Sequence, residues 1–408
     1  MSEVAQVPQL RFPEFSGEWE DGKLGNYGNL INGLTYSPDN IVDDGLLVLR
    51  SSNVQNGQIY LNDNVYVNLD VDDAALTKED DILICVRNGS KRLIGKSTII
   101  NKNLPKSTHG AFMTVFRGES NKFISHWFHS SIYYKEVHKN LGATINSING
   151  SNLKKFKTIF PLKPEQQKIA AFLTAVDNKI EQLSKKQALL GSWKKGLMQQ
   201  IFSQAIRFKA DDGSAFPVWE EKNIVELAKT SIGLVTSMTP YYVDKGVPLI
   251  RNNDIFQNKI RKEKLIRLDY EFDQLNKNRR LFTNDIVTVH TGNIGASAVI
   301  DEELNGCQGF ATLNTRIKNQ NEISSSFLCW YYNSTRNIKY ALSMATGDGR
   351  SNYNLKDFNK ATIPVPSLPE QTKIAIFLSS IDSKIEQVGK QLDESKQFKK
   401  ALLQQMFV

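Results

Sequence analysis

The sequence predicts an α/β (mixed α+β) protein in which two similar globular domains are separated by two long antiparallel helices forming a coiled coil. Three observations predict this pseudo-twofold tandem repeat: a long segment occurs twice, both copies carry a heptad pattern, and a divergent globular stretch precedes each copy. We place a first globular domain at 1–160, a central long helix at 161–205, a second globular domain at 206–365 and a C-terminal long helix at 366–408.

The duplication is clearest where the chain reads PEQQKIAAFLTAVDNKIEQ from Pro164 and PEQTKIAIFLSSIDSKIEQ from Pro369. Without a gap, Pro164–Phe202 matches Pro369–Phe407 with 20 identities in 39 positions. The offset of 205 residues is far longer than the roughly 20–50 residues of a solenoid repeat. It therefore indicates two duplicated halves.

Each globular domain is expected to contain short strands followed by helix and a polar loop. The runs LLVLR, DILICV and STII predict strands, and 123–139 and 327–343 predict helical stretches. Fainter matches relate the two domains: Trp19-Glu20 with Trp219-Glu220, Leu46–Val54 with Val247–Ile255, and Asp81–Val86 with Asp285–His290. The loops 142–152 and 347–354 precede a strand and a Pro-containing turn into each long helix.

Apolar residues alternate at spacings of four and three through both copies, which is a heptad seam. The first seam comprises Ile169, Leu173, Val176, Ile180, Leu183, Gln187, Leu190, Lys194, Leu197 and Ile201. The second comprises Ile374, Leu378, Ile381, Ile385, Val388, Leu392, Ser395, Lys399, Leu402 and Met406. Proline in the first turn and the following Glu165 or Glu370 suit a helix N-terminus, so each helix should run about 37 residues.

Such a narrow seam requires a partner, and the other copy in the same chain is the favoured one. The alternative is that each helix packs on its own globular domain. Antiparallel pairing would place the two domains at opposite ends of a helical ruler. Lysines and glutamines on the outer helix faces could bind a further partner; they are Lys168, Lys179, Lys185, Lys186, Lys195, Gln199 and Gln200.

Composition favours a polyanionic partner. The net charge is +8 and the pI is about 9.1, with lysines spread along the chain. The start lacks the pattern of a signal peptide, and no stretch of 18 apolar residues occurs, so we expect a cytoplasmic protein without a membrane span. Cys85, Cys307 and Cys329 show no CxxC spacing and are expected to be reduced and in apolar surroundings.

Catalytic signatures are not supported. The run GSKRLIGKS at 89–97 has five residues between its glycines where a phosphate loop has four, and a strand-like segment follows it, so it predicts a basic hairpin turn. His126, His129 and His138 lack the acidic or cysteine companions of a metal site. The scattered carboxylates Asp80, Asp81, Glu220 and Glu221 are expected to be solvated, which gives a nuclease little support.

Two variable globular domains, each closed by a P-E-Q-x-K-I-A-x-F-L-x-x-x-D-x-K-I-E helix, resemble the DNA specificity subunit of a type I restriction-modification system. The resemblance covers essentially the whole chain. It implies two target recognition domains, each reading one half of a bipartite asymmetric site in double-stranded DNA, and helices that set the unspecified spacer. It further implies a chain without catalysis or a cofactor of its own.

By the same resemblance, two modification subunits methylate adenine with S-adenosylmethionine, and restriction subunits add cleavage that depends on ATP and magnesium.

Recognition domains of this family vary in sequence, so DNA-binding residues are predicted by type and place. Arg suits guanine and Asn suits adenine through paired hydrogen bonds. Three loop segments in each half supply such residues. In the first half they are Arg50, Ser51, Ser52 and Asn53; Arg87, Asn88, Lys91 and Arg92; and Asn146, Ser147, Asn149 and Asn152. Their counterparts are Arg251, Asn252, Asn253 and Asp254; His290, Thr291 and Asn293; and Arg350, Ser351 and Asn352.

Alternatives remain open for these residues and for the whole chain. Strand-end residues such as Arg50 could instead be structural ion-pair partners, and the polar loops could be plain surface turns. The chain could also be a scaffold whose paired domains bind other proteins. A fused methyltransferase or nuclease is disfavoured, because two recognition units already occupy the 408 residues.

Overall fold

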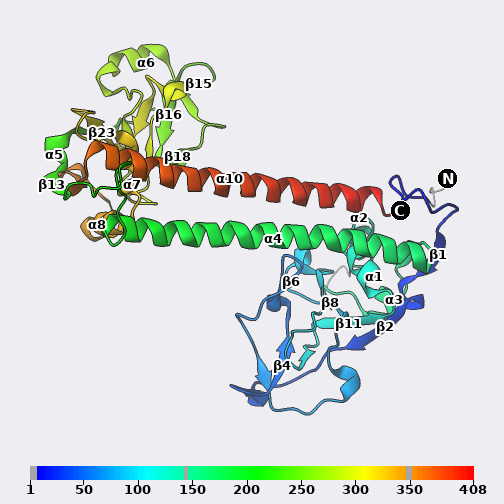
Figure 1. The fold of residues 1–408 in the computed structure, drawn as a ribbon. Helices are drawn as coiled ribbons and strands as arrows, with labels where there is room; N and C mark the ends of the chain where they lie inside the picture. The colour runs from blue at the N-terminus through cyan, green and yellow to red at the C-terminus, as the bar shows by residue number, and fades with distance from the viewer. Residues whose placement is uncertain (1–6, 142–145, 346–351) are drawn as a thin grey trace. The chain divides into compact units, whose positions relative to one another are not determined.

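The computed structural model describes residues 7–141, 146–345 and 352–408 (Figure 1). The chain forms two compact units, Met1–Lys185 with Gly389–Val408 and Lys186–Val388. The boundary between the units crosses both long helices, α4 (Lys163–Phe202) and α10 (Leu368–Gln405). Each unit therefore contains one globular domain, the start of one long helix and the end of the other.

The first globular domain contains two four-stranded sheets, ordered β2-β11-β8-β9 and β10-β4-β7-β3. The first sheet is antiparallel throughout, and the second includes one parallel pair, β10 with β4. The strands are β2 (Gly28–Asn32), β3 (Ile41–Val42), β4 (Leu46–Leu49), β7 (Tyr66–Val67), β8 (Ile82–Cys85), β9 (Ser97–Ile99), β10 (Ser107–His109) and β11 (Met113–Gly118). Two further antiparallel pairs are β1 (Glu20–Lys23) with β12 (Lys157–Phe160) and β5 (Val54–Gln55) with β6 (Gln58–Ile59).

The helical stretch expected at 123–139 is two helices, α1 (Asn121–Trp127) and α2 (Ser131–Asn140). The division follows from Ser130, whose hydroxyl accepts a hydrogen bond from the backbone N–H of Tyr133 and caps α2. A third short helix, α3 (Gly150–Lys154), begins after Asn149.

The second globular domain repeats this topology strand for strand, with sheets ordered β14-β23-β20-β21 and β15-β19-β16-β22. Its strands are β13 (Glu220–Asn223), β14 (Ala228–Ile232), β15 (Tyr242–Val243), β16 (Val247–Arg251), β17 (Ile255–Phe256), β18 (Lys259–Ile260), β19 (Ile266–Leu268), β20 (Ile286–Val289), β21 (Ser297–Val299), β22 (Gln308–Phe310), β23 (Thr312–Ile317) and β24 (Thr362–Val365). Its helices are α5 (Ile224–Leu227), α6 (Tyr270–Leu275), α7 (Ser325–Tyr332), α8 (Thr335–Met344) and α9 (Leu355–Phe358). The expected duplication of the globular domain is confirmed.

The long helices contain 40 and 38 residues and lie side by side within each unit in antiparallel order (Figure 1). In the first unit, Lys399 Nζ of α10 lies 2.5 Å from Asp177 Oδ1 of α4. In the second unit, Lys194 Nζ of α4 lies 2.5 Å from Asp382 Oδ1 of α10. All twenty predicted seam positions are buried or half-buried, so the heptad prediction is confirmed.

The helix ends also belong to the cores of the globular domains. In the first unit, Leu173 and Leu402 pack in one apolar cluster with Trp127, and the rings of Phe123 and Phe407 lie 5.5 Å apart. Met198, Leu378 and Phe327 share the equivalent cluster of the second unit. The helices therefore pack both on each other and on the globular domains. The two arrangements that the sequence left as alternatives, helix pairing and packing on a domain, occur together.

The repeated Pro-Glu-Gln motif anchors each globular domain to its helix. Glu165 is 3 % exposed, accepts two hydrogen bonds of 2.8 Å from the Arg11 guanidinium, and accepts a third from Trp19 Nε1. Gln166 Nε2 donates to the backbone oxygen of Pro161. The carboxylate is thus a buried ion-pair partner as well as a favourable charge at a helix N-terminus.

The second unit repeats these contacts. Glu370 is fully buried and accepts from Arg207 and from Trp219 Nε1, and Gln371 Nε2 donates to Pro366 O. The same three side chains, Arg, Trp and Glu, are therefore brought together twice by residues far apart in the sequence. This contact explains why the motif occurs in both halves.

One expectation about the carboxylates is wrong. Asp81 is 1 % exposed and accepts hydrogen bonds from Arg117, because the first residue before β8 turns inward beside β11. Asp285 and Arg316 form the same pair in the second domain. These pairs hold neighbouring strands together.

The three cysteines are buried free thiols, as expected. Burial raises the pKa of Cys307 to about 12 and also raises the pKa values of Cys85 and Cys329. Within the described ranges, no helix is both long enough and apolar enough to cross a membrane, and His, Cys, Asp and Glu form no group that could hold a metal ion.

Candidate nucleic-acid interface

In the first domain, the three predicted loop segments lie together at one place. Asn88 Nδ2 donates to Ser51 Oγ at 2.9 Å, and Asn88 N donates to Asn146 O at 3.2 Å. Arg87 and Ser147 form an antiparallel β-bridge. The fold therefore brings three loop segments together. The first loop segment follows β4, the second follows β8, and the third precedes α3.

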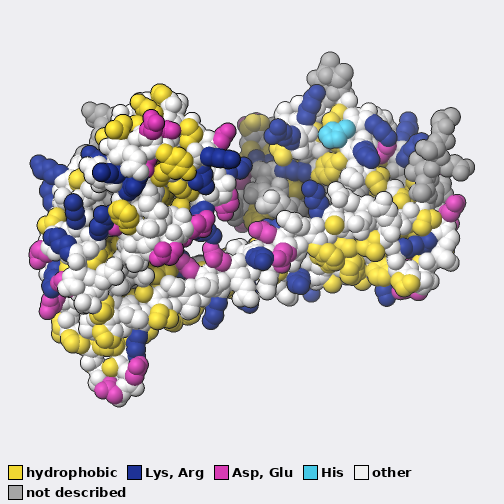
Figure 2. Space-filling view, turned by 90° about the horizontal axis from the view of Figure 1, so that it is seen from above, with side chains coloured by type: hydrophobic (Ala, Val, Ile, Leu, Met, Phe, Trp, Pro, Cys, Tyr) yellow, Lys and Arg dark blue, Asp and Glu magenta, His cyan; other side chains and the backbone are white. Residues whose placement is uncertain are grey.

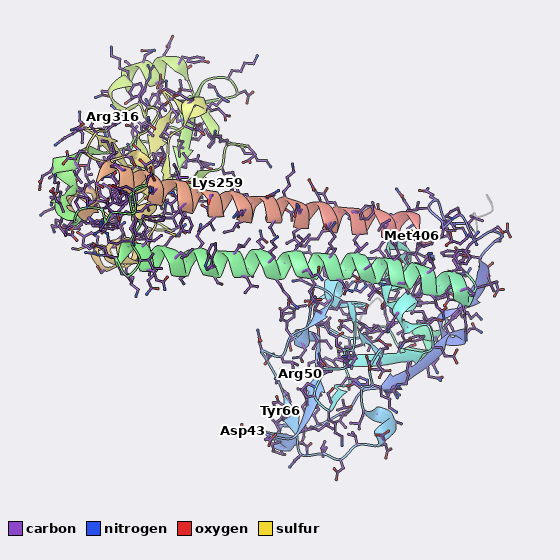
Figure 3. The ribbon with its side chains drawn as sticks, in the orientation of Figure 1. Asp43, Arg50, Tyr66, Lys259, Arg316 and Met406 are labelled. Carbon is purple, nitrogen blue, oxygen red and sulfur yellow. The ribbon has the colours of Figure 1, made fainter. Side chains whose placement is uncertain are left out.

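Two residues of the first loop segment hold the loop itself. The Arg50 guanidinium, at the end of β4 (Figure 3), donates to Asp63 O and lies 2.9 Å from Asp63 Oδ2. Asn53 is fully buried; its Oδ1 accepts from Arg50 N, and its Nδ2 donates to Tyr60 O and Asp63 O. The prediction that Asn53 contacts DNA is corrected, because its amide is enclosed and already bonded. Ser52 remains exposed.

The second loop segment connects β8 and β9, which pair antiparallel, so the predicted hairpin turn is confirmed. Lys91 and Arg92 are exposed on its tip, in a 3-10 turn spanning Lys91–Leu93. Arg87 is also exposed, and its guanidinium carbon lies 5.6 Å from the ring centre of Phe112. This segment presents the most positive charge of the three.

The third loop segment leads into α3. Asn149 Oδ1 accepts from Asn152 N at 2.7 Å, so Asn149 is the N-cap of the helix. Asn146 Nδ2 donates to Gly89 O and links this segment to the hairpin. Asn149 thus has a structural task, while Ser147 and Asn152 are half-buried beside it.

The second domain has an open groove of about 660 Å³ at the equivalent place. It is lined by Arg251, Asn252, Asn253, Thr291, Gly292, Ile294 and Phe310. Arg251 Nε donates to Asp254 Oδ2 at 3.0 Å, which repeats the role of Arg50 as a loop partner. Asn252 Oδ1 is buried and has no hydrogen-bond partner among the described residues. The lining of the groove thus includes two amide side chains, Asn252 and Asn253.

His290 and Asn352 connect the other two loop segments of this domain. Asn352 Oδ1 contacts His290 Nδ1 and accepts from Thr291 Oγ1 at 2.8 Å. Burial lowers the pKa of His290, although the hydrogen bond with Asn352 opposes this, so the ring is neutral at pH 7. Asn293 is exposed, and the predicted residues Arg350 and Ser351 lie outside the described residues.

Residues that the sequence did not indicate complete both surfaces. Phe112 is 55 % exposed beside Arg87, and Phe310 lines the groove of the second domain. The sequence alone does not show whether an isolated Phe before a strand is exposed or lies in the core. Figure 2 shows Lys and Arg side chains spread over the visible face among acidic ones.

The sequence comparisons identify the family. The family model for the type I restriction modification DNA specificity domain matches residues 16–190 and again 218–394. The chain belongs to this family of specificity subunits. Its two matched segments correspond to the two halves of the repeat, and each includes a globular domain with the start of the following helix.

Curated relatives span nearly the same length. The type I restriction enzyme StySPI specificity subunit of Salmonella potsdam is 25 % identical over 400 residues, which cover 92 % of this chain and 85 % of the relative. The EcoKI specificity subunit of Escherichia coli K12 is 22 % identical over 404 residues, with the same coverage. The putative MjaX specificity subunit of Methanocaldococcus jannaschii is 25 % identical over 98 % of this chain and 94 % of that protein.

Solved structures support the fold. A crystal structure of the type I restriction-modification S subunit from M. genitalium matches with a TM-score of 0.62 and 16 % identity, covering 98 % of this chain and 99 % of that one. A chain from a structural study of complex assembly and conformational transition of the type I R-M system matches with a TM-score of 0.55 and 16 % identity. It covers 94 % of this chain and 96 % of that one.

This specificity subunit also has aromatic side chains exposed on its helices. In the first unit, Phe172 and Phe398 line a groove of about 560 Å³, and Phe12 packs edge-on against Phe172 at 5.7 Å. We call Phe12, Phe172 and Phe398 the first aromatic patch. Phe398 is 53 % exposed. Hydrophobic side chains are visible along part of the helix surface in Figure 2.

An equivalent group occurs in the second unit, and we call its residues Phe208, Phe377 and Trp193 the second aromatic patch. Phe208 packs against Phe377 at 5.5 Å, and the Trp193 ring lies 6.5 Å from Phe377. Trp193 is 50 % exposed. Phe172 and Phe377 are 205 residues apart, as are Trp193 and Phe398, so the helix repeat places both patches at equivalent positions. Exposed aromatic groups of this kind mark protein interaction surfaces.

Proposed function

We propose that each globular domain of this specificity subunit reads one half of a bipartite, asymmetric site in double-stranded DNA. The observation that carries the proposal is the repeated convergence of three polar loop segments, once in each domain of a chain that belongs to the specificity family. Different side chains line the two surfaces, so the two half-sites differ in sequence. The net charge of +8 supports binding to a polyanion.

The proposal gives the chain no catalytic step and no cofactor of its own. Two modification subunits would supply adenine methylation with S-adenosylmethionine, and restriction subunits would supply cleavage with ATP and magnesium. Support comes from the names of the curated relatives, which are specificity subunits of type I restriction enzymes. The sequence also lacks a glycine-rich cofactor loop of the usual spacing.

The two aromatic patches fit two copies of one partner, and the modification subunit is the partner that we assign to them. Equivalent patches arise from the same helix positions in both halves, so one partner surface can bind each of them. Phe398→Ala and Trp193→Ala should each remove one modification subunit, measured by native mass spectrometry of the assembled complex. Leu162→Ala, an exposed residue outside both patches, is the matched control.

The main experiment is a genome-wide map of methylated adenines in cells with and without this chain. A bipartite motif that depends on the chain is the expected result. Replacing residues 15–155 with the first domain of another family member should change one half of the motif and keep the other. If both halves change together, the two-reader proposal fails.

The alternative of a protein-binding scaffold predicts no such motif. It also predicts that the complex binds random duplex DNA without a steep dependence on salt, because phosphate contacts are what make binding weaken with salt. Binding at two salt concentrations therefore separates the two functions.

We also propose that the paired helices set the spacer between the half-sites. Inserting four residues within 184–187 of α4 adds about 6 Å of helix. The spacer should lengthen while both half-sequences stay the same, with some loss of affinity because the heptad register shifts. A fully active insertion variant with its original spacer would contradict this role.

A further inference from the structure

Arg87 stands on a firmly held piece of backbone. Its N–H donates to Phe112 O at 3.1 Å, and the preceding residue, Val86, accepts from Ile148 N at 2.9 Å. The β-bridge between Arg87 and Ser147 lies between these contacts. The second and third loop segments therefore fix the position from which the Arg87 side chain extends.

The side chain of Arg87 is exposed and supported by an aromatic face. Its guanidinium lies over Phe112, a ring that is 55 % exposed although it directly precedes β11. In the described part of the chain, no carboxylate forms an ion pair with Arg87. This cation–π contact supports the guanidinium on one side, and its N–H groups form no ion pair with a carboxylate of the described residues.

Arg50 and Arg251, at the ends of β4 and β16, differ from Arg87 because both form ion pairs. Arg50 pairs with Asp63 and Arg251 pairs with Asp254, so both are engaged in their own loops. Lys91 and Arg92 are exposed on the tip of the hairpin, and neither lies over an aromatic ring within the described residues. Flexible cations of this kind suit phosphates, which need charge without a fixed plane.

A planar guanidinium with two parallel N–H donors matches the O6 and N7 acceptors of guanine in the major groove. We propose that Arg87 recognises a guanine in the first half-site, with the ring of Phe112 supporting its guanidinium. This inference rests on the proposed function and extends it to the chemistry of one base.

Among the described residues, the second domain has no such group at the equivalent place. The bridge between Thr291 and Asn352 corresponds to the bridge between Arg87 and Ser147, so Thr291 takes the place of Arg87. Its hydroxyl donates to Asn352 Oδ1. The groove beside it presents Asn252 and Asn253. Among the described residues, an arginine over an aromatic ring at this position therefore occurs in the first domain and not in the second.

The test uses the complex of this chain with its modification subunits and a duplex library in which every base pair of the first half-site is varied. Arg87→Lys keeps the charge and loses the fork of donors. We expect discrimination for guanine at one position to fall about tenfold to a hundredfold, while selectivity in the second half-site is unchanged. Phe112→Leu should lower the same discrimination by a smaller factor.

Arg92→Gln is the matched control on the same hairpin. It should weaken methylation of all sequences by a similar factor and reduce the salt dependence, without relaxing any base position. Retained discrimination in Arg87→Lys, or a wild-type first half-site without a G·C pair, would overturn the inference and leave the proposed function standing. A wild-type complex without any bipartite specificity would overturn the proposed function itself.

Discussion

In each unit, the helix pair packs against the globular domain at an equivalent junction. Different side chains form this junction in the two units. In the first unit, Asp177 pairs with Lys399, and His126 of α1 reaches Thr174 Oγ1 at 3.2 Å. In the second unit, Asp382 pairs with Lys194, and Trp330 of α7 donates to Ser379 Oγ at 3.3 Å. The Lys194 ammonium lies 5.3 Å from the centre of the Trp330 ring.

The comparison separates what the repeat preserves from what each domain supplies. The ion pair and the hydroxyl come from the duplicated helices and are kept in both units. The ring comes from the divergent globular domain, and it differs. An imidazole in the first domain and an indole in the second therefore occupy the same place, and each has a ring nitrogen beside the helix hydroxyl.

The two junctions also differ in electrostatics. Burial, followed by the nearby charges of Lys399 and His129, lowers the pKa of His126 from 6.5 to about 3. Burial also lowers the pKa of His129, whose equivalent in the second domain is Asn333. Both histidines are therefore neutral in the folded protein at pH 7, and of the two junctions only the first contains histidine rings that resist protonation.

The largest expected loss of stability tests a contact that both units contain, the buried glutamate at the start of each long helix. Replacing Glu165 or Glu370 with Ala leaves a partly buried arginine and a buried tryptophan N–H without their acceptor. Each change should cost about 3 kcal/mol of unfolding free energy. Chemical denaturation followed by tryptophan fluorescence measures it, with Glu119→Ala, a surface ion-pair residue, as the control. A large effect at only one of the two sites would break the equivalence.

The next effect tests the difference between the junctions. Below about pH 6.5 the unfolded chain protonates His126, whereas the folded chain resists protonation down to about pH 3. Stability that is complete above pH 6.5 is therefore lost as the pH falls towards 3, by about 1.4 kcal/mol for each pH unit from His126, and His129 acts in the same direction. Hydrogen exchange at pH 6.5 and 5, corrected for intrinsic rates, should show α1 and α2 loosening more than α7 and α8.

A double variant provides the matched control for this pH effect. His126→Trp with His129→Asn gives the first junction the residues of the second, so it should remove the part of the difference in acid sensitivity that these two histidines cause. Carboxylate pairs such as Asp81–Arg117 and Asp285–Arg316 occur in both units and contribute similarly to both. Equal acid sensitivity of the two units in the wild type would contradict the assigned role of His126.

The smallest effect concerns the helix ion pairs. Asp177→Asn and Asp382→Asn should each cost about 1 kcal/mol, because the pairs are only partly buried. Asp382→Asn should cost more, since Lys194 and Asp382 are 18 % and 28 % exposed while Asp177 is 38 % exposed. Thermal unfolding of both variants measures the ranking, and a reversed order would show that the neighbouring ring outweighs burial.

Much of the fold follows from local pattern. The heptad spacing identified the seam of both helices, and the fainter matches identified equivalent strands, because each helix or strand exposes one face to a core at a fixed period. The break between α1 and α2 at Ser130 was not predicted, since a capping serine within an apolar stretch is no different in sequence from a surface serine.

The candidate interface followed from the sequence only in part. The loops after β4 and β8 and before α3 were recognised as polar, and the structure places them together. The assignment of individual residues required the structure. Asn53 is enclosed while its neighbour Ser52 is exposed, and Arg50 is ion-paired while Arg87 is free to stack on Phe112. The DNA contacts of the remaining predicted residues stay predictions.

The sequence by itself determined the duplication, the two long helices and their seam, because periodicity and identity are properties of the chain alone. Only the tertiary structure decided which polar groups are available to a ligand. Glu165 meets Arg11 across 154 positions, and Asn88 meets Ser51 across 37. Burial and hydrogen-bond partners depend on such distant contacts, and a buried polar group lowers stability unless it finds a partner. The same residue type therefore supports the fold at one position and is available to a ligand at another.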